Sequence, residues 1–171
     1  MGKEEVVDLV DSGDGVIGRA TLDRCLGEGL RHRAVAVLVE RSDGRVVLQV
    51  RSKSDHWHPG RWTLSSTGHV GAGESYAAAA KRELAEELGL SSAVKLVKKL
   101  FLPKVRSRGS VEWEVVSLFR SVSDEAAHPD PGEVDSTREV TLRELRSELG
   151  RRRLTPDAKI LIRTYLTAVK A

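Results

Sequence analysis

Residues 68–90, GHVGAGESYAAAAKRELAEELGL, carry charged residues and glycines at a distinctive spacing. Five residues separate Gly68 from Glu74, and seven more separate Glu74 from Arg82, which opens the run REL-x-EE-x-GL. At residue frequencies of about 5–7% each, a chance match to this spacing in a chain of this length has a probability of roughly one in ten million. The spacing therefore indicates a functional site.

The central part of this segment predicts a helix with three carboxylates on one face. Residues 75–88 are rich in Ala, Leu, Glu, Lys and Arg and contain neither Gly nor Pro, and Gly89 then ends the helix. On that helix Glu83, Glu86 and Glu87 are spaced i, i+3 and i+4. Three unpaired carboxylates repel one another, and Mg²⁺ or Mn²⁺ relieves this because these ions prefer oxygen ligands and keep waters that phosphate oxygens displace.

The loop before the helix is expected to support that site. Arg82 lies on a different face of the predicted helix and is placed to pair with Glu74, which ties the loop to the helix. Gly68, Gly71 and Gly73 allow the loop to fold tightly and bring its backbone close to a bound ion. Taken alone, three glutamates at this spacing are more often a solvated helix face. The glycines and the Glu74–Arg82 pair in register favour the metal and diphosphate site.

This segment resembles the Nudix box at every constrained position. The resemblance implies the α/β fold of the Nudix superfamily, an α/β/α sandwich with a mixed β-sheet. It also implies Mg²⁺-dependent attack of water on a nucleoside diphosphate linked to another group, with one of the helix glutamates deprotonating the water. The implied metal ligands are Glu83, Glu86 and Glu87 with the carbonyl of Thr67, and the implied orienting residues are Gly68, Glu74 and Arg82.

A second resemblance extends beyond the box, to type I isopentenyl diphosphate isomerases, which have the Nudix fold. It rests on RSKSDHWHPGRWTLSSTGHVGAGES, on VEWEVVSLF and on the N-terminal hairpin. Those isomerases carry a catalytic cysteine and several metal-binding histidines and glutamates. Carried over by position, four of the metal-binding residues are present here, as His69, His32, Glu112 and Glu114. The catalytic cysteine, however, is replaced by Thr67, and one upstream histidine by Cys25.

These departures favour hydrolysis over isomerisation. Moving a double bond in an unactivated alkene needs a strong acid and a base on opposite faces of the substrate, and the hydroxyl of Thr67 has a pKa far above that of a thiol. The isomerases also lack carboxylates at the positions of Glu83 and Glu86. We therefore expect a hydrolase of the isomerase-like branch that cleaves a diphosphate linkage in a nucleoside di- or triphosphate or a nucleotide conjugate. The alternatives are an isopentenyl-diphosphate delta-isomerase and a catalytically inactive nucleotide-sensing module, which the intact carboxylates argue against.

Several residues outside the box are further candidates, each with a structural alternative. Arg51 and Lys53 leave a predicted strand just before the box and are candidates for binding phosphate. His69 contacts metal or phosphate, or simply hydrogen-bonds the loop. Glu112 and Glu114 share one face of a predicted strand, which suits a further metal ligand or a general base. We expect structural roles for His32 and Cys25 and surface positions for His56 and His58.

The expected elements place these residues in a mixed sheet covered on both faces. Strands are expected at 5–10 and 16–20, forming a hairpin, and then at 33–40, 46–51, 94–103 and 111–122. Residues 27–29 read as a linker, and 52–63, 104–110 and 123–136 as loops. Helices are expected at 141–149 and 156–169, the second capped by Thr155 with Pro156 at its first position.

Composition predicts one domain over residues 1–171, with a hairpin extension at 1–30, the box at 68–90 and C-terminal helices at 141–169. Apolar content of 40%, charged content of 31% and a net charge of +3 suit a soluble globular protein without a nucleic-acid partner, and no apolar run reaches membrane-spanning length. The lone Cys25 and the absence of a signal-peptide core favour the cytoplasm. The expected partner is a small-molecule diphosphate, and either a monomer or a homodimer is compatible with the sequence.

Overall fold

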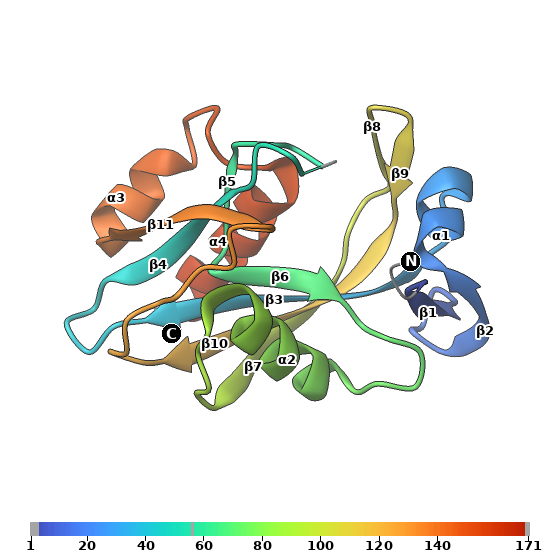
Figure 1. The fold of residues 1–171 in the computed structure, drawn as a ribbon, viewed down its shortest axis with the longest axis horizontal. Coiled ribbons are helices and arrows are strands. Elements are labelled where there is room, and N and C mark those ends of the chain that lie inside the picture. Colours follow the sequence, from blue (N-terminus) through green and yellow to red (C-terminus); the bar gives the residue numbers. More distant parts are fainter. Residues whose placement is uncertain (1–3, 56, 170–171) are drawn as a thin grey trace.

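The computed structural model describes residues 4–55 and 57–169 and contains a mixed sheet between two helical layers (Figure 1). Its central strand, β3 (His32–Glu40), runs parallel to β10 (Glu114–Val122) and antiparallel to β4 (Val46–Arg51) and β6 (Ser66–His69). Beyond β10 lies β7 (Val94–Phe101), and beyond β4 lies β11 (Val134–Val140). The short β5 (Trp62–Thr63) pairs with β4.

The sequence of β3 explains why both faces of the sheet are covered. Ala34, Ala36 and Leu38 point into one core, whereas the intervening valines, Val35 and Val37, point into the other. A strand that is apolar at successive positions buries both its faces. Helix α2 (Tyr76–Leu88) packs into the valine side, and α3 (Leu142–Glu148) and α4 (Pro156–Ala168) pack into the other. The expected α/β/α sandwich is therefore confirmed.

Side chains at the helix ends agree with the sequence expectations. Ser75 and Thr155 cap α2 and α4 with their hydroxyl oxygens, and Pro156 opens α4. Gly89 ends α2 with a φ of 65°, in the left-handed region that glycine adopts without strain. None of the described helices is long and apolar enough to cross a membrane.

The N-terminal hairpin is present as β1 (Val6–Val10) and β2 (Val16–Thr21), but the expected linker at 27–29 is wrong. Residues Leu22–Glu28 form helix α1, because Thr21 supplies an N-cap and Gly29, at a φ of 68°, supplies the C-cap. Gly27 therefore lies inside a helix. Hairpin and helix together sit at one end of the sheet, where α1 contacts β9 (Figure 1).

Three other expectations are corrected. Residues 104–110 are not a loop, because β8 (Val105–Ser107) and β9 (Ser110–Glu112) form a two-stranded hairpin. The expected strand at 111–122 is interrupted at Trp113, which separates the end of β9 from β10. The expected loop at 123–136 ends early, because β11 begins at Val134. This polar segment forms an edge strand because it pairs with β4.

Candidate functional site

The carboxylates of α2 meet the backbone of β6, which packs against this helix. Glu83 and Glu87 are buried, whereas the Glu86 side chain is 56% exposed. The backbone N–H of Thr67 donates to Glu87 Oε2 at 3.0 Å, and Gln49 Nε2 donates to the same oxygen at 3.3 Å. These donors fix the direction of the Glu87 carboxylate.

Gly68 makes room for Glu83. A Cβ placed on Gly68 would lie 2.1 Å from the carboxyl carbon of Glu83 and 2.3 and 2.5 Å from its oxygens. At such distances an added side chain would force the carboxylate to move, so the carboxylate takes the space of a missing Cβ and lies against the β6 backbone. This is the physical reason for a glycine at the first position of the box.

Arg82 links the loop to the helix, as the sequence predicted. Its Nε and Nη2 donate to the two carboxylate oxygens of Glu74, both at 3.0 Å. The same guanidinium also donates to Glu83 at 2.6 Å, to Glu86 at 3.1 Å and to the carbonyl of His69 at 3.0 Å. The expectation that Arg82 lies on a separate face, leaving three unpaired carboxylates, is therefore wrong.

The electrostatics of this cluster fit a divalent cation. Burial raises the pKa of Glu83 to about 7 and that of Glu87 to about 8, while the guanidinium of Arg82 lowers the pKa of Glu74. Buried carboxylates disfavour the charged form unless a cation compensates, and an all-oxygen donor set is the one that Mg²⁺ and Mn²⁺ prefer. The residues present thus suit the metal that the box implies.

A second group of potential ligands lies beside the first. His32 Nε2 and His69 Nε2 lie 3.6 and 3.5 Å from the same oxygen of Glu114, and one ligand atom from each residue falls within 4.8 Å of the others. The carbonyl of Leu30, 2.9 Å from His32 Nδ1, sets the direction of the His32 ring. His32 Nε2 is buried and has no hydrogen-bond partner among the described residues.

This arrangement suits a nitrogen and oxygen metal site. Burial opposes ionisation of Glu114, but the two imidazoles outweigh it and lower the pKa of that carboxyl. Burial likewise opposes the charged form of His69, but the Glu114 carboxylate raises its pKa. Two imidazoles and a carboxylate are common ligands of divalent transition metals. The structure therefore brings His32, expected to be structural, together with His69 and Glu114.

The expectation that Glu112 and Glu114 share one strand is wrong, whereas Cys25 has the structural position expected for it. Glu112 ends β9 and Glu114 begins β10, so the two carboxylates do not share one continuous strand, although both line the same cavity. Burial and the neighbouring Glu114 raise the pKa of Glu112 well above its ordinary value. Cys25 is fully buried in a small apolar cluster with Val7 and Ala20.

Two adjoining cavities share the candidate residues. One, of about 270 Å³, contains the helix carboxylates, and the other, of about 90 Å³, contains Glu112, Glu114 and an apolar floor. Both are lined by Arg51, Thr67, Gly68 and His69. The first is also lined by Glu5, Gln49, Asp55, Arg82, Glu83, Glu86, Glu87 and Glu133.

The cations named from the sequence are not equally placed. Arg51 lies between the two cavities, pairs with Asp55 at 2.7 Å and has a buried Nε without a hydrogen-bond partner among the described residues. Lys53 is exposed and lines neither cavity. His58 lines neither cavity, and His56 lies outside the described residues.

Sequence reasoning missed Asp157, which lines the smaller cavity with Glu112 and Glu114. The sequence does show where Asp157 lies: Thr155 and Pro156 identify the start of a helix, and Asp157 lies in its first turn. No spacing in the sequence connects it with the box, because α4 approaches the site only through packing on the sheet.

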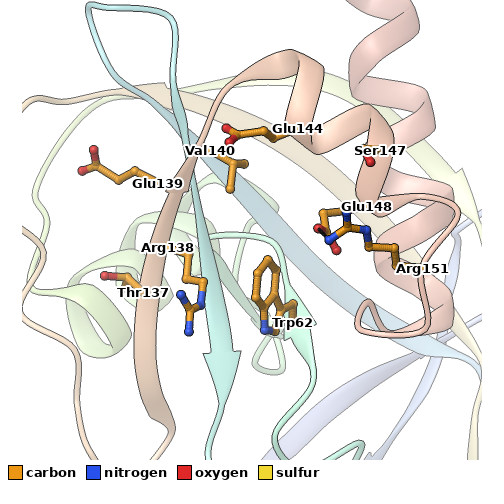
Figure 2. Close-up of a pocket in the computed structure, with 9 residues that line it drawn as sticks. All are labelled: Trp62, Thr137, Arg138, Glu139, Val140, Glu144, Ser147, Glu148 and Arg151. Carbon is orange, nitrogen blue, oxygen red and sulfur yellow. Dashed lines mark hydrogen bonds and ion pairs between the residues drawn. The ribbon is translucent and has the colours of Figure 1, made fainter.

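A larger cavity, of about 490 Å³, lies between β11 and α3 (Figure 2). Its charged residues are largely engaged with one another or with near neighbours. Glu148 pairs with Arg151 at 3.0 Å, Glu139 pairs with Arg45 at 2.6 Å, and Glu144 completes the cap of α3. Because it contains none of the box residues, this cavity is not the candidate active site.

Comparison with known proteins agrees with the geometry. The family model described as "NUDIX domain" matches residues 30–164. The chain belongs to the Nudix family. Among curated Nudix relatives, an uncharacterized Nudix hydrolase of Streptomyces coelicolor is 35% identical over 157 residues, 90% of this chain and 84% of that protein. An isopentenyl-diphosphate Delta-isomerase of Serratia proteamaculans is 32% identical over 148 residues, 86% of this chain and 83% of that protein.

The Nudix fold is also shared with solved structures. The crystal structure of the Deinococcus radiodurans protein DR0079 superposes with a TM-score of 0.77 at 22% identity, covering 93% of this chain and 98% of that one. A likeness at this identity concerns the fold alone. The relatives thus include proteins named as hydrolases and proteins named as isomerases, so the choice between the two reactions depends on the site.

Proposed function

We propose that this Nudix protein is a metal-dependent hydrolase that cleaves a diphosphate linkage in a nucleoside diphosphate derivative, such as a nucleoside di- or triphosphate or a nucleotide conjugate. The observation that carries the proposal is the contact between Gly68 and Glu83. A buried carboxylate occupies the space of a missing Cβ, beside a second buried carboxylate, Glu87, that accepts from the Thr67 amide. This arrangement presents oxygen ligands at the edge of a cavity large enough for a diphosphate.

In this proposal the metal ligands are Glu83, Glu86 and Glu87, with the Thr67 carbonyl. A bound Mg²⁺ or Mn²⁺ would supply positive charge to the diphosphate oxygens and lower the pKa of an attacking water. Arg82 holds Glu83 and Glu86 in place through bonds of 2.6 and 3.1 Å and is itself fixed by Glu74. The role of this pair is to orient the ligands before substrate arrives.

Phosphate binding is assigned to Arg51 and His69; Lys53, the third candidate named from the sequence, is exposed and lines neither cavity. Arg51 has the strongest support, because it faces both cavities and its Nε is buried without a partner among the described residues. A guanidinium there could engage phosphate oxygens in pairs. His69, which faces both cavities, connects this region to Glu114 at 3.5 Å.

The group formed by His32, His69 and Glu114 is assigned to a second divalent ion, with Glu112 as an additional ligand. The carboxylate of Glu114 is the alternative general base to a glutamate of α2, because it faces the smaller cavity. The two groups of ligands adjoin across Gly68 and His69, which line both cavities.

Isomerisation of isopentenyl diphosphate is the second candidate function, and the clustering of His32, His69 and Glu114 favours it, as do the isomerase-named relatives. Thr67 argues against it, since an alcohol is a far weaker acid than the thiol that the isomerases carry at this position. A nucleotide sensor without catalysis is the third candidate, and the complete set of helix carboxylates argues against that.

Substituting Glu87 tests the proposal directly. Glu87→Gln keeps the size and the acceptor oxygen for the Thr67 amide but removes the charge, so Mg²⁺-dependent turnover should fall by at least about hundredfold with the fold preserved. Glu125→Gln, on an exposed loop, is the matched control and should retain activity. Undiminished turnover in Glu87→Gln would overturn the assigned site.

A further inference from the structure

The N-terminal hairpin, which precedes the range matched by the family model, is hydrogen-bonded to the box loop. The carbonyl of Val6 accepts from the Ala72 N–H at 2.9 Å, and Val7 forms an isolated bridge with Gly71. Asp8 then accepts from the backbone N–H of Gly73 at 2.8 Å. Three successive residues of β1 therefore contact three successive residues of the loop.

Asp8 is the polar anchor of this contact. Its side chain is only 6% exposed, and its second oxygen accepts from Arg19 Nε at 3.0 Å. Gly73 has a φ of 77°, a conformation that other residues rarely adopt, and its N–H is directed out of the loop to the carboxylate. A bond between a carboxylate and a backbone N–H is charge-assisted and stronger than a neutral one.

A second anchor joins the hairpin to the beginning of α2. Asp14, in the hairpin turn, accepts from the hydroxyl of Tyr76 at 3.0 Å and from Arg33 Nε at 2.7 Å, and it pairs with Lys99. Tyr76 is the first residue of α2. The hairpin thus holds the box from two sides, at the tip of its loop and at the start of its helix.

Hydrogen bonds connect the first anchor to the carboxylates. Gly73 precedes Glu74, whose side chain accepts from the Gly71 N–H at 2.9 Å and pairs with Arg82. Arg82 in turn donates to Glu83 at 2.6 Å. If Gly73 shifts, Glu74 shifts with it, and the guanidinium that fixes Glu83 loses its support.

We propose that Asp8 is a positioning residue for the active site: by holding the Gly73 N–H, the N-terminal hairpin sets the loop geometry in which Arg82 orients Glu83. The consequence for turnover rests on the proposed hydrolysis and the consequence for metal binding rests on the proposed ligands, whereas the consequence for the loop rests on neither. Residues that precede the matched family range would thereby control the ligands of the box.

Amide hydrogen exchange tests the contact itself. In Asp8→Ala, amides 71–75 should exchange about tenfold or more faster than in the wild type, and in Asp8→Asn they should lie closer to the wild type because the side-chain carbonyl still accepts. Val10→Ala, which creates a cavity at another buried position of the same strand, is the control for general loosening of the hairpin. Equal exchange of these amides in Asp8→Ala and Val10→Ala would overturn the proposal.

Metal binding and turnover then test positioning. Mn²⁺ binding can be measured by titration, with the free ion followed by its electron paramagnetic resonance signal. The affinity of the protein for Mn²⁺ should be about tenfold weaker in Asp8→Ala than in Val10→Ala, and Asp8→Asn should partly restore it. With an active substrate, kcat should fall by about tenfold to hundredfold. Mn²⁺ affinity that is unchanged in Asp8→Ala would overturn the positioning role. Wild-type protein that binds Mn²⁺ tightly but hydrolyses nothing would overturn the proposed function while leaving this inference standing.

Discussion

Gly68 and Glu83 are in such close contact that a methyl group on the glycine would overlap the carboxylate, with its Cβ 2.1 Å from the carboxyl carbon. Gly68→Ala should therefore displace Glu83, weaken Mg²⁺ or Mn²⁺ binding by more than about tenfold and lower kcat/KM by roughly hundredfold, as expected for a ligand moved by about an ångström. Calorimetric titration and steady-state kinetics measure both. Gly27→Ala is the control, because its Cβ would meet nothing within 4 Å; near-wild-type metal binding in Gly68→Ala would contradict the account.

Thr67 contacts the box through its backbone. Its N–H donates to Glu87, so a change of side chain leaves this bond in place. Thr67→Cys should retain hydrolysis within about threefold of the wild type. An assay of the same variant with isopentenyl diphosphate tests whether a thiol at this position allows proton transfer to the alkene. If Thr67→Cys lost hydrolysis and gained isomerisation, the site would be suited to isomerisation, and the proposed hydrolase function would be wrong.

Replacing Arg82 tests the frame around the carboxylates. Arg82→Lys keeps the charge but cannot donate simultaneously to Glu74, Glu83 and the His69 carbonyl. We expect turnover to fall by about hundredfold and the Tm to fall by about 3–6 °C, since one or two partly buried charge-assisted bonds are lost. Arg163→Lys, on α4 away from the box, should leave both quantities unchanged. If Arg82→Lys kept wild-type turnover, the Glu74–Arg82 pair would not be needed to orient the carboxylates.

The buried Glu87 should make stability depend on pH. Its pKa is about 8 in the folded protein, against an ordinary value of 4.5. Between these two pH values the folded protein therefore keeps a proton on Glu87 that the unfolded chain has lost. The free energy of unfolding therefore decreases as pH rises from about 5 to 8. Thermal unfolding across this range should show a shallower decline in Glu87→Gln than in the wild type. Added Mg²⁺ should raise the wild-type Tm more at pH 8.5 than at pH 6. If the Tm of the wild type and that of Glu87→Gln fell in parallel with rising pH, burial would not be what raises the pKa of Glu87.

Much of the site was predictable because the box is local in sequence. A helix capped by Ser75 and Gly89 places Glu83 and Glu87 on one face regardless of the rest of the fold, and Glu74 and Arg82 are only eight positions apart. Helical periodicity and capping depend on neighbours along the chain, so sequence reasoning reads them well.

Contacts between distant segments were harder to predict. His32 meets Glu114 because β3 and β10 pair in parallel with these two residues opposite each other, a register that no local pattern specifies. The role of Asp8 similarly depends on the hairpin folding over residues 71–73. Helix α1 was missed for a different reason: its caps, Thr21 and Gly29, enclose Gly27, whose presence favoured a linker.

The most direct test of hydrolysis is Mg²⁺-dependent product release by the wild-type protein across one panel of substrates. The panel contains nucleoside di- and triphosphates, nucleotide sugars, dinucleoside polyphosphates and isopentenyl diphosphate, with Glu87→Gln as the inactive reference. We expect phosphorylated products from at least one nucleotide, dependent on Mg²⁺ and absent in the variant. Rearranged isopentenyl diphosphate without phosphate release, or no reaction with any member of the panel, would contradict this expectation.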